Sequence, residues 1–178
     1  MNRLPEDHSN TNISGLVKGL EMRKIKNPFS HIEGYNCFGC SPKNTLGLQM
    51  QFYEDGDWII SDWEPKLHLN GYGNILHGGI QTTLLDEIAS WLLYVKLETA
   101  GVTSNINVNF RKAVEANKGK LKIRAKLVEH NRKIASIFCE LINADGIVCT
   151  DAEVKYFIFS QAVAKEKFYY PGKEAFFE

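Results

Sequence analysis

The longest regular hydrophobic pattern in the chain runs over residues 78–101, in the segment GGIQTTLLDEIASWLLYVKLETAG. Its apolar residues recur at steps of three and four, which is the period of one buried face of an α-helix. These residues are Ile80, Leu84, Leu85, Ile88, Trp91, Leu92 and Val95. Gly101 comes after the last of them and is a typical residue for the end of a helix. The pattern therefore predicts one long helix.

Six other segments have the alternating or short apolar patterns of β-strands. Two of them, 46–55 and 58–64, precede the helix, and Asp55-Gly56 between them suits a hairpin turn. The strand segments after the helix are 102–114, 120–130, 133–143 and 147–160. One long helix on antiparallel strands is an α+β layer, and this is the predicted fold class.

The two ends of the chain have weaker patterns. Apolar residues are loosely spaced as on an amphipathic helix from about Ile13 to Ile25, with two glycines among them. The tail could begin with a helical turn but shows no clear fold. We therefore expect an N-terminal extension over 1–36 with a helical part, one domain over 37–160, and a C-terminal tail over 161–178.

Composition narrows the class of protein. The chain has 178 residues, and its 21 Lys and Arg residues balance 21 Asp and Glu residues. No global charge draws it to nucleic acid or to an anionic membrane, so neither is expected as a partner. No apolar run approaches the ~18 residues that span a bilayer, and the start lacks the apolar core of a secretory signal. A cytoplasmic location with reduced thiols is the expectation.

The start and middle of the predicted helix carry unusual chemistry. His77-Gly78-Gly79 stand at its start, and Asp86 lies nine residues after the histidine, next to Glu87. An acidic pair on a helix is usually a solvated face, but LHGGIQTTLLDE resembles the hotdog-fold thioesterase superfamily, in the branch of the phenylacetate-pathway and 4-hydroxybenzoyl-CoA thioesterases. The segment CFGCSPKNTLGLQMQF is similar to one before the first strand in a group of this superfamily. The resemblance covers roughly residues 37–160.

The resemblance implies a hotdog fold, with a long central helix wrapped by an antiparallel sheet. It implies an acyl-CoA thioesterase that needs no cofactor, with coenzyme A as part of a small-molecule substrate. The free N–H groups at a helix start can polarise a thioester oxygen, and glycine lets the carbonyl approach closely. Gly78 would thus form an oxyanion hole, helped by Gly79, while His77 shapes the loop. Asp86 would be the nucleophile or the base that activates water.

The spacing of Gly78 and Asp86 predicts a shared site. Eight residues of continuous helix separate the two by about 12 Å, so one carbonyl carbon cannot lie beside both. A second helix that runs antiparallel would pair Gly78 of one subunit with Asp86 of the other. The motif therefore implies a homodimer, which could pair further into a homotetramer. Glu87 lies about 100° round the helix and should face elsewhere.

Further candidates are polar or basic residues near these elements. Relatives often carry an asparagine six residues before the histidine, where this chain has Gly71, with Asn70 one position earlier. A Ser or Thr after the helix often orients water, and alternation lets only one of Thr103 and Ser104 face the site. The expected catalytic set therefore adds Asn70 and Ser104. The expected substrate-binding residues, including cations for the phosphates of coenzyme A, are Asn74, Thr103, Arg111, Arg132 and Lys133.

Cys37-Phe38-Gly39-Cys40 has the spacing of half a zinc site. The other half is missing from the sequence, because Cys139 and Cys149 lie apart on strands and no histidine pair is near. A redox pair is a second possibility, and a structural turn is the favoured one. No metal is expected.

Two rival functions stay open. A hotdog dehydratase or hydratase would need a histidine paired with an acid, and the acid here has the thioesterase spacing instead. A non-catalytic protein that binds an acyl ligand is the other rival, because the usual asparagine is displaced. The sequence leaves the acyl group open, and the carrier could be coenzyme A or an acyl carrier protein.

Overall fold

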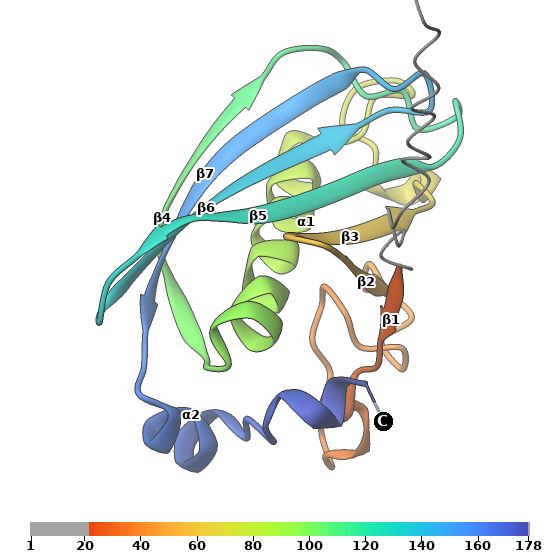
Figure 1. The fold of residues 1–178 in the computed structure, drawn as a ribbon. Coiled ribbons are helices and arrows are strands. Elements are labelled where there is room, and N and C mark those ends of the chain that lie inside the picture. The colour runs from red at the N-terminus through yellow and green to blue at the C-terminus, as the bar shows by residue number, and fades with distance from the viewer. Residues whose placement is uncertain (1–21, 178) are drawn as a thin grey trace, which may run out of the picture.

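The computed structural model describes residues 22–177, in which one curved antiparallel sheet wraps around a central helix, α1 (Gly78–Leu92) (Figure 1). The strands lie in the order β1-β2-β3-β5-β6-β7-β4. They are β1 (Arg23–Ile25), β2 (Phe52–Asp55), β3 (Trp58–Trp63), β4 (Gly101–Phe110), β5 (Leu121–His130), β6 (Ile134–Ile142) and β7 (Val148–Ile158). The predicted architecture of one long helix on an antiparallel sheet is confirmed.

Helix α1 forms the core because its apolar face lies against the inner face of the sheet. Leu84, Leu85 and Ile88 are fully buried, and the Trp91 ring stacks on Phe52 of β2 with 4.3 Å between ring centroids. Burial of side chains of this size contributes about 1.5–3 kcal/mol each. Between residues 22 and 177, no helix is long and apolar enough to cross a membrane.

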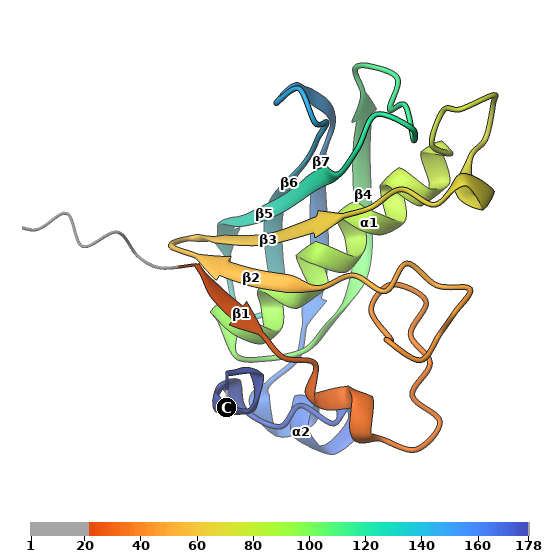
Figure 2. The same cartoon turned by 90° about the vertical axis from the view of Figure 1, so that its right-hand side faces the viewer.

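Strand β4 lies at one edge of the sheet because α1 carries the chain across the inner face before β4 begins (Figure 2). It is a ten-residue strand and pairs with β7 on one side. Within the described part of the chain, no strand pairs with its other side. A long edge strand with free N–H and C=O groups is a surface for pairing with another chain.

The predicted strand over 46–55 is wrong in its first half, since β2 begins only at Phe52. Gln49 has a left-handed backbone (φ +56°), which interrupts an extended strand. Leu48 and Met50 keep their apolar side chains buried, but their N–H groups donate to the carbonyls of Phe38 and Gly39. Pairing with the cysteine loop therefore replaces pairing with a strand.

The end of the long helix also differs from the prediction. After α1 the chain makes a π-helical turn over Leu93–Leu97, and Glu98 ends it with a left-handed backbone. Gly101 is instead the first residue of β4, where a Cβ would lie 2.8 Å from the carbonyl oxygen of Phe157. This glycine permits close strand packing. It does not end the helix.

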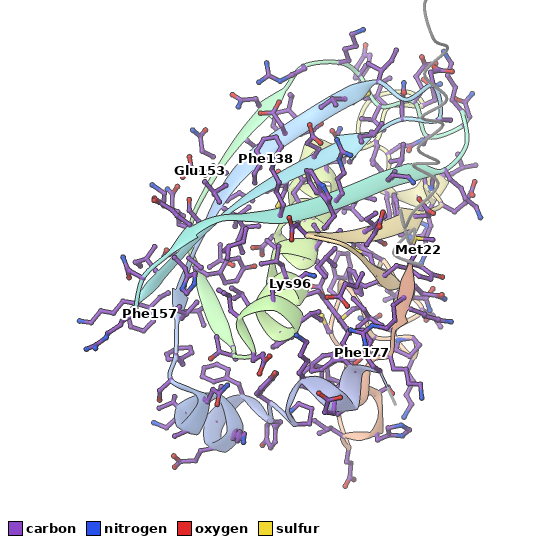
Figure 3. The ribbon with its side chains drawn as sticks, in the orientation of Figure 1. Met22, Lys96, Phe138, Glu153, Phe157 and Phe177 are labelled. Atoms are coloured by element: carbon purple, nitrogen blue, oxygen red, sulfur yellow. The ribbon has the colours of Figure 1, made fainter. Side chains whose placement is uncertain are left out.

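Both ends of the described chain fold onto one end of the molecule (Figure 2). The predicted N-terminal helix lies outside the described residues except for its last part, where Arg23–Ile25 form β1 instead. The tail, predicted to have no clear fold, forms α2 (Gln161–Phe168) and a short 3₁₀ turn that buries Phe176 completely. Arg23 lies over the ring of Phe177, so the first and last described segments touch. Figure 3 shows the labelled Phe177 close to β1.

Candidate active site

Asp86 lies on the flank of α1 that faces β4, and two hydroxyl groups hold its carboxylate. Thr103 Oγ1 and the Tyr156 hydroxyl each donate to Asp86 Oδ1, both at 2.7 Å. The Tyr156 hydroxyl is also 2.8 Å from the Asp86 carbonyl oxygen. No residue between 22 and 177 donates a hydrogen bond to Oδ2. One oxygen is therefore anchored, and the other is available to a ligand or a water molecule.

Tyr156 is a site residue that the sequence prediction missed. It lies on β7 opposite Thr103 and is almost completely buried. Burial and the negative charge of Asp86 raise the pKa of Tyr156, so its hydroxyl stays protonated as a donor. Its inward position follows from the alternation of β7, but the helix residue it reaches depends on the packing of α1.

The start of α1 leaves one backbone N–H free. His77 is the N-cap, and its Nδ1 accepts a hydrogen bond from the N–H of Gly79 at 2.9 Å. The N–H groups of Ile80 and Gln81 both donate to the His77 carbonyl oxygen. The N–H of Gly78 has no acceptor among residues 22–177. It is the candidate oxyanion donor, and His77 has the geometry of a positioning residue.

The two glycines at the helix start differ in what a larger residue at the same position would contact. A Cβ at Gly79 would lie 3.1 Å from His77 Nδ1, so glycine there makes room for the capping imidazole. A Cβ at Gly78 would meet only the Phe110 ring, at an ordinary 3.4 Å. The contacts of the described chain do not require glycine at position 78, and the space beside it is open to something from outside.

Gly78 and Asp86 cannot act on the same atom within one chain. The helix is continuous from Gly78 to Leu92. Eight residues therefore separate the two groups by about 12 Å along the helix axis. Each chain therefore carries two candidate half-sites, the free N–H at the start of α1 and the free carboxylate oxygen in its middle.

The predicted loop asparagines differ in what they contact. Asn74 Nδ2 donates to Asn117 Oδ1 at 2.9 Å, which ties it to the loop after β4 and away from Asp86. Asn70 donates only a long bond, 3.4 Å, to the Gly73 carbonyl oxygen. Its Oδ1 is buried without a hydrogen-bond partner among the described residues. Asn70 therefore keeps a free polar group close to the start of α1, and Asn74 does not.

The structure distinguishes the two hydroxyl candidates on β4. Thr103 reaches Asp86, whereas Ser104 Oγ donates to the Lys155 carbonyl oxygen at 2.9 Å. The register of β4 against β7 shifts between Thr103 and Asn105, which is a bulge at this point. Thr103 therefore faces the carboxylate. Ser104 faces β7, so its orientation does not fit the expectation that it is catalytic.

The predicted phosphate-binding residues fall at opposite ends of the sheet. Arg111 forms an ion pair with Asp151, so its guanidinium is already engaged. Arg132 and Lys133 are exposed in the turn between β5 and β6, and their side chains have no polar partner within residues 22–177. Tyr156 of β7 pairs with Thr103 on one side and Ala135 on the other. This turn therefore lies at the same end of the sheet as Asp86, whereas Arg111 lies at the opposite end.

Glu87 lies on a different flank of α1 from Asp86, as predicted, but it is not a solvated side chain. Its carboxylate lies 3.7 Å from Cys37 Sγ, and it accepts a hydrogen bond from Trp91 Nε1 at 3.0 Å. Burial raises the pKa of Glu87 to about 7. A hydrogen bond from the Cys40 thiol lowers the pKa of Cys37 to about 5. The cysteine loop and the second acid thus form a separate polar cluster.

Comparison with known proteins bears on the fold and the family. A family model described as the thioesterase superfamily matches residues 73–150, which include both half-sites. A thioesterase from Haemophilus influenzae is 22% identical, with a TM-score of 0.60 over 68% of this chain and 86% of that one. A hypothetical thioesterase from Streptococcus pneumoniae, solved with coenzyme A, is 23% identical. Its TM-score is 0.56, and the match covers 59% of this chain and 83% of that one. No curated protein matches the sequence.

A further solved structure, of a thioesterase superfamily protein, is 19% identical with a TM-score of 0.60. The match covers 66% of this chain but only 57% of that longer chain. At these identities the solved structures establish the fold, which is the hotdog fold. The family match over 73–150 and the shared fold confirm the resemblance to the hotdog-fold thioesterase superfamily that the sequence shows.

Proposed function

We propose that this protein is an acyl-CoA thioesterase, which uses water to split a thioester into a carboxylic acid and free coenzyme A. The observation that carries the proposal is Asp86, whose Oδ1 is fixed by two hydroxyl donors while Oδ2 is left free. A fixed carboxylate with one open oxygen suits a nucleophile or a general base. The match to the thioesterase superfamily model and the neighbour solved with coenzyme A support the substrate class. A cytoplasmic location suits the four free thiols.

The proposed site is assembled by two subunits. Strand β4 would pair with its copy across a two-fold axis, which brings α1 of each subunit antiparallel to the other. The exposed edge of β4 and the half-sites about 12 Å apart on one helix support this homodimer. Gly78 of one subunit would then face Asp86 of the other, and a dimer would contain two sites.

In the proposed reaction, the N–H of Gly78 donates to the thioester oxygen. Asp86 Oδ2 takes a proton from water as the water oxygen attacks the carbonyl carbon, or it attacks that carbon itself. Negative charge grows on the thioester oxygen, where the N–H stabilises it most in the transition state. The tetrahedral intermediate then expels the coenzyme A thiolate, which takes up a proton. When water attacks, the carboxylic acid is formed directly; when Asp86 attacks, a second step in which water hydrolyses the acyl–Asp86 anhydride releases the acid and restores the carboxylate. Thr103 and Tyr156 keep the carboxylate aligned throughout.

The turn between β5 and β6 is proposed to hold the phosphates of coenzyme A. We expect Arg132→Glu with Lys133→Glu to raise KM for acyl-CoA roughly tenfold while kcat changes little, because distant charges bind ground and transition states alike. Steady-state kinetics check this. Lys112→Glu with Lys120→Glu is the matched control, since it reverses two equally exposed charges beyond the opposite ends of β7 and β5. An unchanged KM in the first variant would assign the phosphates to another surface.

A panel of acyl-CoA thioesters, assayed for release of free coenzyme A, tests the proposed function. Hydrolysis of at least one member supports it, and binding without turnover across the panel would favour an acyl-ligand binding protein. Hydration of an enoyl-CoA would favour a dehydratase or hydratase. The geometry favours this last rival least, because His77 Nδ1 is occupied by Gly79 and no histidine among residues 22–177 bonds to Asp86.

A further inference from the structure

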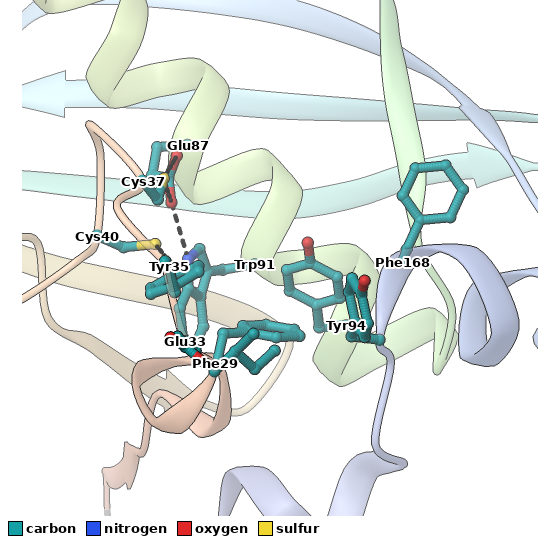
Figure 4. A pocket seen from close by; sticks show the side chains of 12 residues that line it. Phe29, Glu33, Tyr35, Cys37, Cys40, Glu87, Trp91, Tyr94 and Phe168 are labelled. Atoms are coloured by element: carbon teal, nitrogen blue, oxygen red, sulfur yellow. Dashed lines mark hydrogen bonds between the residues drawn. The ribbon is translucent and has the colours of Figure 1, made fainter.

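A second cluster of reactive side chains lies on the Glu87 flank of α1, outside the proposed catalytic site. Cys37 and Cys40 come from the loop after a 3₁₀ turn at Pro28–His31, and Glu87 comes from α1. One ligand atom of each lies within 4.8 Å of the others (Figure 4). We infer that Cys37, Cys40 and Glu87 bind a zinc ion.

The spacing of these atoms suits a tetrahedral zinc centre. Cys37 Sγ is 3.7 Å from both carboxylate oxygens of Glu87. Zinc lies about 2.3 Å from sulfur and about 2.0–2.2 Å from oxygen, so tetrahedral angles place the sulfur and oxygen about 3.5–3.7 Å apart. Cys37 and Glu87 are therefore spaced as two ligands of one ion, and Cys40 Sγ lies within 4.8 Å of both.

The loop is held in place by the rest of the fold. Its backbone is fixed to the segment before β2, where the N–H of Leu48 donates to the Phe38 carbonyl oxygen at 2.7 Å. Gly39 packs directly on the acid, because a Cβ there would collide with the end of the Glu87 side chain. Glycine at this position therefore leaves the carboxylate in place beside the cysteine loop.

The negative charge of the Glu87 carboxylate would be stabilised by a bound cation. Glu87 is half-buried, and it forms no ion pair with any Lys, Arg or His of residues 22–177. A carboxylate partly withdrawn from water in this way is costly unless a positive charge pairs with it. The hydrogen bond from Trp91 Nε1 occupies Oε1 and fixes the orientation of the carboxylate. A divalent ion bonded to two thiolates and this carboxylate would supply the missing positive charge.

The donor set favours zinc over other ions. Two thiolates select against magnesium and calcium, which prefer oxygen ligands alone, and two cysteines are too few for an iron–sulfur cluster. Three protein ligands leave the fourth position of zinc open. A cavity of about 360 Å³ adjoins the cluster, and Tyr35, Trp91 and Tyr94 are among the residues that line it. Water or a small ligand could complete the coordination from this side.

The expectation of no metal rested on a missing second pair of cysteine or histidine ligands. The structure supplies a third ligand of another kind, because Glu87 is 47 positions along the chain from Cys40 and approaches it only when α1 packs against the loop. The inference does not depend on the proposed thioesterase activity, and its test measures metal alone.

The test is metal analysis of the reduced full-length protein after incubation with Zn²⁺ and gel filtration. We expect one zinc per chain, and Co²⁺ in its place should give the strong absorption of thiolate-to-cobalt charge transfer. Cys37→Ser with Cys40→Ser should reduce bound zinc to background, and Glu87→Gln should weaken binding at least about tenfold. Gly39→Ala should also weaken it, because the new Cβ displaces the carboxylate. Cys149→Ala, at a buried strand thiol, is the matched control and should keep the metal.

The wild-type spectrum makes the inference testable even if a variant fails to fold. Reduced wild-type protein that retains no zinc, or a cobalt form without thiolate absorption, would overturn the inference. Full retention of zinc by the double cysteine variant would overturn it too. A Cys37–Cys40 disulfide in a protein whose reduced form binds no metal would make the pair a redox site instead.

Discussion

Asp86→Asn is expected to remove most of the thioester hydrolysis while the protein stays folded and keeps the oligomeric state of the wild type. The amide keeps the size of the side chain and can still accept from Thr103 and Tyr156 at Oδ1. It replaces the free carboxylate oxygen by a group that can neither attack a carbonyl nor take a proton from water. Loss of such a group commonly costs about 10²–10⁴-fold in rate, roughly 3–5 kcal/mol of barrier. Single-turnover hydrolysis of the best acyl-CoA substrate measures the effect.

A second aspartate provides the control for this variant. Asp62→Asn removes one carboxylate from β3, where the side chain is exposed and only loosely paired with Lys122. Its kcat should stay within about twofold of wild type, as expected for a surface substitution. Near-normal turnover in Asp86→Asn would mean that Asp86 is an interface residue and that the chemistry lies elsewhere in the molecule.

Gly78→Pro is expected to lower kcat by about 10²–10³-fold, the usual cost of losing one oxyanion donor. Proline has no N–H, so the substitution removes the proposed donor. Proline is also well tolerated at the first position of a helix, where no hydrogen bond within the helix is lost. The residue before it, His77, already has the extended backbone (φ −57°, ψ 134°) that a following proline prefers. Circular dichroism and light scattering should therefore match wild type, and steady-state kinetics give the change in kcat.

Gly78→Ala separates the lost N–H from added bulk. Alanine keeps the donor, and its Cβ meets only the Phe110 ring at an ordinary distance within the described chain. We expect a much smaller loss of kcat than in Gly78→Pro. Equal losses in the two variants would show that space beside position 78, and not its N–H, is what the reaction needs.

The sequence predicted the parts of the fold whose periodicity is regular. The helix from Gly78 and the four strands after it followed from steps of three and four and from alternation, because in this domain one face of each element is buried. The strand over 46–55 was predicted too long, since Leu48 and Met50 are buried at alternate positions without pairing as a strand. Burial at alternate positions gives the sequence pattern of a strand, but a β-strand also requires backbone hydrogen bonds to a neighbouring strand.

The residues of the candidate sites likewise divide into those that a local sequence motif reveals and those that only the packing of the fold brings together. Gly78 and Asp86 were predicted from a motif that resembles the thioesterase superfamily, and this motif lies within one helix and can be read along the chain. Tyr156 and the pairing of Glu87 with Cys40 depend on contacts between segments distant in sequence. Such contacts arise only when α1 packs against β7 and against the cysteine loop, so no local spacing could reveal them.

The central claim is that each site takes Asp86 from one subunit and Gly78 from the other, and subunit complementation tests it most directly. Asp86→Asn and Gly78→Pro proteins, each nearly inactive alone, are mixed in equal amounts and allowed to exchange subunits. Half of the dimers would then be mixed, and each would contain one intact site, so about a quarter of wild-type activity should return. Activity that stays at the sum of the two variants, while native mass spectrometry shows mixed dimers, would contradict the shared site.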